Sequence, residues 1–320
     1  MSATGAGGLD VGLAGRRVRG YFAPVNRATS APVVFDPAVL GRFGVGAAPT
    51  PWVDLGWCSG FKRTSETKIA SVVTGAPGTV GSQVRTQVGA EVAFAFETWG
   101  RLQVALAAGA QSLNLLKAAA GAAANGSGGV AEAPIALGAG STAGVLRVAS
   151  TSGFAVGDLV AVDVDYAGQI GFVGTGVSGA YVRSSAAVGG DVNFIRRVTL
   201  NVGRVASIAA GTLTLEVPLP AGVPTSGMQV SPMVGYCDRE GGNFFAEWSG
   251  VFVMDGEQGD RVIFHYPRLQ AMEGAREMPA AMSGGLEQVR LVGSFRALPV
   301  VDRNDGETCV CFRSYLPAAR

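Results

Sequence analysis

The sequence predicts a mainly-β fold in which two β-rich outer segments flank a different, smaller β module. Glycine makes up 48 of 320 residues without a period of three, which indicates many tight turns and excludes a collagen-like chain. Residues 84–97 alternate between two kinds of side chain, as a long half-buried strand does. Most of the remaining chain consists of short apolar runs bounded by turn residues.

The composition argues against several classes of protein. Hydrophobic residues make up 48% and charged residues 15% of the chain, so disorder caused by excess charge is not expected. The net charge of +1 lacks the basic excess that drives tight binding to nucleic acid. The four cysteines and the single histidine form no zinc-ligand pattern. We expect the cysteines to be buried free thiols in a reducing compartment.

Neither the N-terminal residues nor the longest stretch of low charge predicts a membrane element. Residues 1–19 are rich in glycine, lack the apolar core of a signal peptide, and predict a flexible N-terminal arm. The longest stretch of low charge, residues 102–131, is interrupted by polar residues and glycine, so no membrane span is predicted. The chain is therefore expected to be soluble and made in the cytoplasm.

The first outer segment begins with short strands near residues 21–25 and 52–61, a polar turn at 62–66, and a strand from Lys68. GAPG at 75–78 predicts a turn. The long strand that follows has one face directed at a core and one at water or a polar channel. The core face carries Val84, Thr86, Val88, Ala90, Val92, Phe94 and Phe96, and the polar face carries Arg85, Gln87, Glu91 and Glu97.

A helix is expected next, because Trp99, Leu102 and Leu106 recur at helical spacing. Thr98 is the predicted N-cap and Gly109 the predicted C-cap. Trp99 is expected to anchor this helix in the core. A second short turn is expected around residues 113–116.

The chain is expected to contain one discontinuous domain with an insertion. Residues 118–129 read as a low-complexity linker, and short β pieces up to about residue 230 predict a small barrel or sandwich. Four strong strands follow, and only the first segment offers them a core partner. In the third of them Val289, Leu291, Phe295 and Ala297 are predicted to share the core face. We therefore expect a domain of residues 20–132 and 231–320, with 133–230 inserted.

Motifs that carry chemistry are weak throughout the chain. GTGVSG at 174–179 fits a phosphate-binding glycine pattern, but no acidic residue lies at the required distance after it. Asp163 and Asp165 resemble half of a calcium loop whose later ligands are missing. His265 lies within an apolar strand, where a packed or hydrogen-bonded histidine is expected. We therefore predict no enzyme activity, no cofactor and no metal site.

Five segments resemble tail tube proteins of tailed phages and related prophage elements. They are YFAPVNRAT (21–29), PWVDLGWCSGFKRTSETK (51–68), VRTQVGAEVAFAFETWGRLQVALAAG (84–109), and the C-terminal pair DRVIFHYPRLQ (260–270) and VRLVGSFRALPVVDRNDGE (289–307). The resemblance covers the two outer segments and leaves the middle module outside it. That module looks like a small barrel attached to phage structural proteins.

The resemblance implies two antiparallel sheets packed as a sandwich and flanked by one helix. It also implies rings, usually hexameric, that stack into a tube. DNA passes through such a tube during ejection without specific binding. The other partners would be tail proteins, and the location would be the virion tail, assembled in the bacterial cytoplasm. The alternative is a baseplate, fibre or surface-binding protein whose inserted domain contacts cell-surface glycan.

A channel for DNA calls for modest, mixed polarity on the faces that line it. The strands at 84–97 and 286–300 offer such faces, which would equally suit an ordinary solvent-exposed sheet. The candidate lumen-facing residues are Arg85, Gln87, Glu91, Gln288, Arg290 and Arg296.

Overall fold

The computed structural model describes residues 17–25, 31–49, 51–109, 113–120, 132–164, 201–225, 227–237, 247–257, 259–272, 276–281 and 287–318. Their fold is mainly β, which confirms the predicted class. Two short helices occur among these residues, α1 (Pro37–Leu40) and α2 (Arg101–Ala108). The strands form an eight-stranded sheet, a seven-stranded sheet and the small pair β15 (Val300–Val301) and β16 (Thr308–Cys309).

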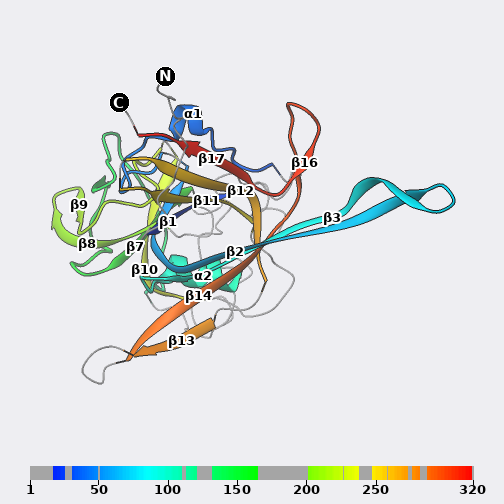
Figure 1. The fold of residues 1–320 in the computed structure, drawn as a ribbon. Coiled ribbons are helices and arrows are strands. Elements are labelled where there is room, and N and C mark those ends of the chain that lie inside the picture. Colours follow the sequence, from blue (N-terminus) through cyan, green and yellow to red (C-terminus); the bar gives the residue numbers. More distant parts are fainter. Residues whose placement is uncertain are drawn as a thin grey trace.

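The eight-stranded sheet combines the two outer segments of the chain (Figure 1). Its order is β13-β14-β3-β2-β1-β11-β12-β17, and all of its pairings are antiparallel. Its strands are β1 (Val18–Pro24), β2 (Val53–Thr74), β3 (Thr79–Phe96), β11 (Glu247–Asp255), β12 (Arg261–Ala271), β13 (Arg276–Ala281), β14 (Glu287–Ala297) and β17 (Phe312–Leu316).

This sheet closes on itself, because β12 also pairs with β14. The pairs are Leu269 with Ala297, Gln270 with Arg296, and Ala271 with Phe295. The strands β14, β3, β2, β1, β11 and β12 therefore form a closed barrel, and β13 and β17 extend from it as edge strands. The two layers expected of a sandwich are opposite walls of this one sheet.

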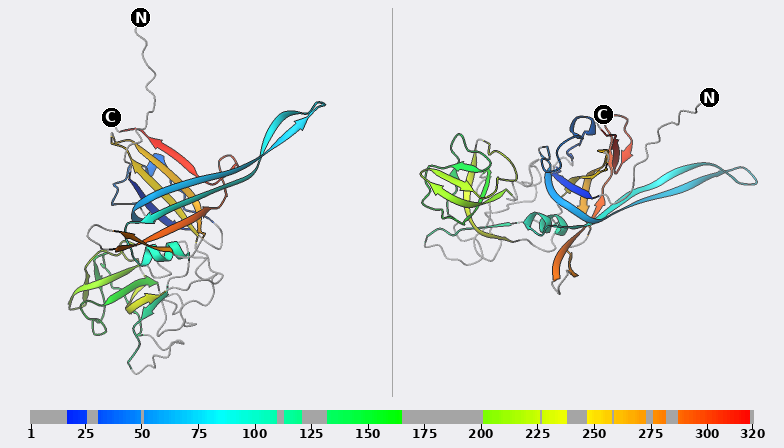
Figure 2. Two further views of the ribbon diagram at one scale, coloured as in Figure 1. Left: turned by 60° about the horizontal axis from the view of Figure 1, so that its bottom comes forward. Right: turned by 60° about the vertical axis from the view of Figure 1, so that its left-hand side comes forward.

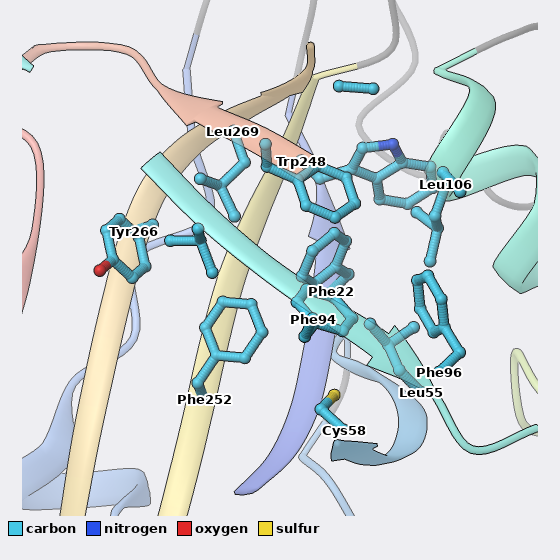
Figure 3. Packing of buried hydrophobic residues seen from close by; sticks show 14 of the residues in the cluster. Phe22, Leu55, Cys58, Phe94, Phe96, Leu106, Trp248, Phe252, Tyr266 and Leu269 are labelled. Carbon is cyan, nitrogen blue, oxygen red and sulfur yellow. The ribbon is translucent and has the colours of Figure 1, made fainter. Parts of the chain in front are cut away.

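Aromatic side chains from five barrel strands fill the interior (Figure 3). Phe22, Phe94, Phe252 and Phe295 are each no more than 2% exposed. The rings of Phe94 and Phe295 stack with centroids 5.6 Å apart, and Phe22 meets Phe295 edge-on at 5.3 Å. Helix α2 adds the fully buried Leu106 to the same cluster. The predicted flanking helix therefore covers part of the barrel core.

The ends of α2 agree with the sequence prediction only in part. Gly109 adopts the left-handed conformation, with φ of 60°, and caps the C-terminus as predicted. The N-cap is Gly100 and not Thr98, whose hydroxyl accepts a hydrogen bond from Gln103. The helix thus begins later than the spacing of its apolar residues indicated.

Two further expectations around this helix are wrong. Trp99 precedes the helix, is 54% exposed, and donates from Nε1 to Glu277 Oε1 at 3.2 Å. It is not a core anchor, because the late helix start takes it off the buried face. The turn expected at residues 113–116 is instead the strand β4 (Leu113–Leu116), which pairs with β10.

The middle of the chain builds the second sheet around its own apolar cluster. Its order is β4-β10-β7-β8-β9-β6, with β5 paired to β10. The remaining bounds are β5 (Ile135–Ala136), β6 (Val145–Arg147), β7 (Leu159–Val164), β8 (Val202–Ala209), β9 (Thr212–Leu215) and β10 (Met228–Cys237). The chain enters this sheet at Leu113 and leaves it at Cys237, and these two residues are cross-strand partners.

Tight packing of the barrel interior makes Gly293 a test of this core. A methyl group there would lie 2.7 Å from Phe295 and 3.1 Å from Phe96, two rings that are fully buried. We expect Gly293→Ala to lower the free energy of unfolding by about 1–3 kcal/mol, since the rings have no room to move. Urea unfolding followed by tryptophan fluorescence measures the loss.

Gly44→Ala is the matched control, because nothing lies within 4 Å of the added methyl group. It should leave the free energy of unfolding within about 0.5 kcal/mol or raise it slightly. Equal effects of the two substitutions would contradict the packing described for the barrel.

Candidate assembly surface

Strands β2 and β3 continue well past the barrel wall. The adjoining strand β1 pairs with β2 only as far as Cys58, and β14 pairs with β3 only from Ala90 to Phe96. Beyond the pair of Ser65 with Ala90, the two strands pair only with each other. Residues 66–89 thus form a two-stranded ribbon that projects from the barrel (Figures 1 and 2).

The ribbon exposes apolar side chains that a soluble monomer usually buries. Every residue from 66 to 87 is exposed. Five of them are β-branched and apolar, with exposed fractions of 43–59%, namely Ile69, Val72, Val73, Val80 and Val84. An isolated two-stranded hairpin is only marginally stable in water, and contiguous exposed apolar surface marks sites of interaction. The ribbon is therefore the strongest candidate for a contact surface.

A bulge at Thr86 determines which ribbon residues share a face. Lys68 pairs with Gln87, whereas the next residue, Ile69, pairs with Arg85, so Thr86 has no cross-strand partner. Cross-strand partners lie on the same face, and consecutive residues of one strand lie on opposite faces. Arg85 is therefore on the opposite face from Gln87, contrary to the alternation read from the sequence.

Both faces of the ribbon carry apolar residues. Val73 and Val80 are cross-strand partners and share a face with Ile69. Val72 and Val84 lie on the other face, because Val84 pairs with the residue two positions before Val72. A partner could therefore bury apolar surface on either face of the ribbon.

The long edges of the ribbon present unpaired backbone groups. Among the described strands, none pairs with β2 on its β1 side after Cys58, and none pairs with β3 on its β14 side before Ala90. Free N–H and C=O groups along such an edge can accept a strand from another chain. Closure of the barrel leaves few other places in the eight-stranded sheet where this is possible.

Four of the predicted lumen residues lie on one continuous face of β3 and β14. Glu91 and Arg296 are cross-strand partners, and Arg296 Nη2 donates to Glu91 Oε1 at 2.9 Å. Gln87 shares the β3 face with Glu91, and the exposed Arg290 shares the β14 face with Arg296. This face points away from the aromatic core and has mixed charge.

The other two predicted lumen residues differ from this group. Arg85 is exposed, but the bulge at Thr86 places it on the opposite face of the ribbon from Gln87. Gln288 pairs with Ala280 in the backbone register of β14 and β13, and its side chain lies outside the described set.

Strand β14 also extends beyond the barrel, in the part where it pairs with β13. Val289, predicted to face the core, is 49% exposed because the barrel wall ends near Leu291. Met278 of β13 is 41% exposed. The edge strand β13 contains Pro279, which has no N–H to offer a neighbouring strand. This second projection is therefore less suited to strand pairing than the ribbon.

The described residues offer little for catalysis. Burial lowers the pKa of His265 to about 4 and raises the pKa of the Cys58 thiol to about 12. Asp163 is buried, while Asp165, Gly168 and the 174–179 motif lie outside the described residues. The part of the chain that the structure describes contains no group of three or more metal-ligating side chains. No described helix is long and apolar enough to cross a membrane.

No protein-family model matches this chain, and no curated protein matches it.

The sequence correctly predicted the turn at 75–78 between two strands, but the turn expected at 62–66 is wrong, because β2 is continuous there. It also did not predict that the ribbon is exposed. The available signal was the turn at 75–78, flanked on both sides by long runs of β-branched and polar residues without large aromatic side chains. Such runs can extend a hairpin, but they bring no residue large enough to fill a barrel interior.

The ribbon should be dispensable for folding of the barrel. Replacing residues 66–89 with Asn-Gly joins the partners Ser65 and Ala90 by a two-residue hairpin turn. We expect the free energy of unfolding to fall by no more than about 1 kcal/mol, because Val88 is the one partly buried apolar residue of this range that packs against the barrel core. Urea unfolding tests this, and a loss of several kcal/mol would show that the ribbon supports the barrel.

Proposed function

We propose that this chain is a structural subunit of a phage-type tail tube, which assembles with copies of itself into stacked rings. The observation that carries the proposal is the ribbon of residues 66–89, with its exposed apolar side chains and unpaired edges. A two-stranded ribbon is only marginally stable by itself, so contact with a partner would stabilise it. Other copies of the same chain are present in any solution of this protein and can be that partner. Self-association is therefore the simplest way to cover it.

The proposed assembly uses one kind of contact. The ribbon of one copy contacts a different surface of the next copy, so the contact is head-to-tail. Repeated contacts of this kind form rings when the rotation closes and filaments when it does not. A stacked-ring tube combines both outcomes.

The mixed-charge face of β3 and β14 suits the wall of a DNA channel. Arg296 is held by Glu91 at 2.9 Å, so part of its charge is compensated within the chain. Gln87 adds a neutral polar side chain to the same face. The net charge of +1 gives no strong attraction to phosphate. We propose that this face lines the lumen and lets DNA pass without holding it.

Apolar contacts of the ribbon should set the concentration at which assembly begins. We expect the variant Ile69→Thr/Val73→Thr/Val80→Thr to raise this concentration roughly 100-fold, at about 1 kcal/mol for each side chain that is buried on assembly. Threonine keeps the β-branched shape and strand preference. Sedimentation velocity over a concentration series, with negative-stain imaging, measures the change.

Ser71→Thr/Ser82→Thr is the matched control on the same ribbon, and it should assemble like the unchanged chain. A full-length chain that remains monomeric at every concentration would overturn the proposal. So would a triple variant that assembles as readily as the control.

The second sheet should be separable from assembly. Leu113 and Cys237 are cross-strand partners, so residues 113–237 can be replaced by a short Gly-Ser linker without separating the flanking ends. We expect the shortened chain still to form rings or tubes, seen by negative stain. Loss of assembly, with the barrel still folded, would place the contact surface on the second sheet. Glycan binding by that sheet would favour the alternative of a surface-binding module.

A further inference from the structure

The connection between β1 and β2 forms a strap over the outside of the barrel. The strap, residues 31–49 with Pro51 and Trp52, lies over the outer faces of β1, β11 and β12. Phe35 and Trp52 of the strap are at most 5% exposed, and they pack with Val251 and Ile263 of the strands beneath. This apolar cluster is distinct from the aromatic cluster inside the barrel.

The strap contains only one short helix, so barrel side chains bind several of its carbonyl groups. Tyr21 Oη donates to the Val45 carbonyl at 2.7 Å. Arg261 Nη1 donates to the carbonyls of Gly41 and Phe43, each at 2.9 Å. These bonds hold the middle of the strap against the strands.

A third contact, near the start of the strap, passes through His265. Ser249 Oγ donates to the Val33 carbonyl at 2.7 Å and lies 3.1 Å from His265 Nε2. A hydroxyl has a single proton, and Ser249 uses it on Val33. His265 Nε2 is therefore the donor to Ser249 Oγ, and the ring is neutral when Nδ1 carries no proton.

Aromatic rings enclose the imidazole on its remaining sides. It stacks on Phe312 of β17 with centroids 5.8 Å apart, and it meets Trp52 and Phe35 of the strap edge-on at 5.8 and 6.3 Å. His265 is 3% exposed. A charged imidazole in this position would have lost its hydration, and none of the described carboxylates offsets that loss.

The other titratable groups described on this outer face make different contacts. Arg261 binds Asp255 at 2.6 Å, and Tyr21 binds the strap backbone. The elements against the ring contribute Ser249 from β11, Phe312 from β17, and the aromatic residues of the strap. Burial is the main cause that lowers the pKa of His265, to about 4, and only the Val33 backbone opposes it.

We propose that His265 is an acid-sensitive latch, whose protonation releases the strap from the outer face of β1, β11 and β12. The closed strap requires a neutral ring, because it excludes the water that a cation needs. Opening would hydrate the imidazolium and expose the apolar cluster between strap and strands. The proposal concerns the folded chain and does not depend on tube assembly.

The direction of the pH dependence follows from the lowered pKa. Stability of the closed strap is complete above pH 6.5, the ordinary value for histidine, and is lost as the pH falls toward 4. Between pH 7 and pH 5 the equilibrium for strap closure should weaken on the order of 20-fold. Groups without a changed pKa contribute nothing to this difference.

Because His265 is the only histidine of the chain, its titration can be followed in the full-length protein by NMR with labelled histidine. Hydrogen exchange with mass spectrometry measures how well the backbone amides of the strap are protected. One of them is the Gly41 amide, which donates to the Pro37 carbonyl. We expect an imidazole pKa well below 6.5, and strap protection, corrected for intrinsic exchange, that falls on the order of 20-fold from pH 7 to pH 5. Amides of β10 should not change.

His265→Gln is the matched variant, since its amide can donate to Ser249 but does not titrate. Its strap should keep the same protection at both pH values. An imidazole that titrates near pH 6.5, or a strap whose protection does not change between pH 7 and pH 5, would overturn the proposal. An equal loss in the variant and the unchanged chain would also overturn it. If the variant does not fold, the titration and exchange of the unchanged chain still decide.

Discussion

Pairing between β12 and β14 joins two strands that would otherwise lie on separate walls of the barrel. The contact involves Leu269, Gln270 and Ala271 on one side and Phe295, Arg296 and Ala297 on the other. It brings Phe295 over Phe94 and Phe22, so the aromatic interior depends on it. The other edge of β14 pairs with β3, where Arg296 reaches Glu91. Core packing and the mixed-charge face thus both depend on β14.

Strands that extend beyond the closed barrel have unpaired edges. Within the closed part, edges are satisfied by neighbours in the same chain. The ribbon of residues 66–89 has no such neighbour among the described strands, yet it carries the apolar residues of a half-buried sheet. A barrel with such a ribbon is well suited to contact between identical subunits, because the barrel anchors the base of the ribbon and leaves its two edges unpaired.

Local pattern was sufficient for much of the fold. Alternation correctly predicted that Ala90, Val92, Phe94 and Phe96 are buried, and Gly109 correctly marked the end of the helix. Alternation identifies a strand and its faces, but it does not show where the neighbouring strand ends. For this reason Val84 was expected in the core, although it is 51% exposed.

Other features depend on partners that are distant in sequence. The bulge at Thr86 arises from the register between β2 and β3, and it places Arg85 on the opposite face from Gln87 and Glu91. Barrel closure depends on the pairing of β12 with β14, and the sequence of neither strand alone indicates that pairing. His265 was expected to be packed or hydrogen-bonded, and it is both, but the strap that covers it could not be read from the flanking residues.

Cryo-electron microscopy of assembled full-length protein tests the central claim most directly. The account predicts rings or tubes in which residues 66–89 of each copy lie against the neighbouring copy, with Ile69, Val73 and Val80 buried in the contact. The face that carries Glu91 and Arg296 should line the lumen. Assemblies in which the ribbon projects freely into solvent, or a protein that forms no assembly at any concentration, would contradict the account.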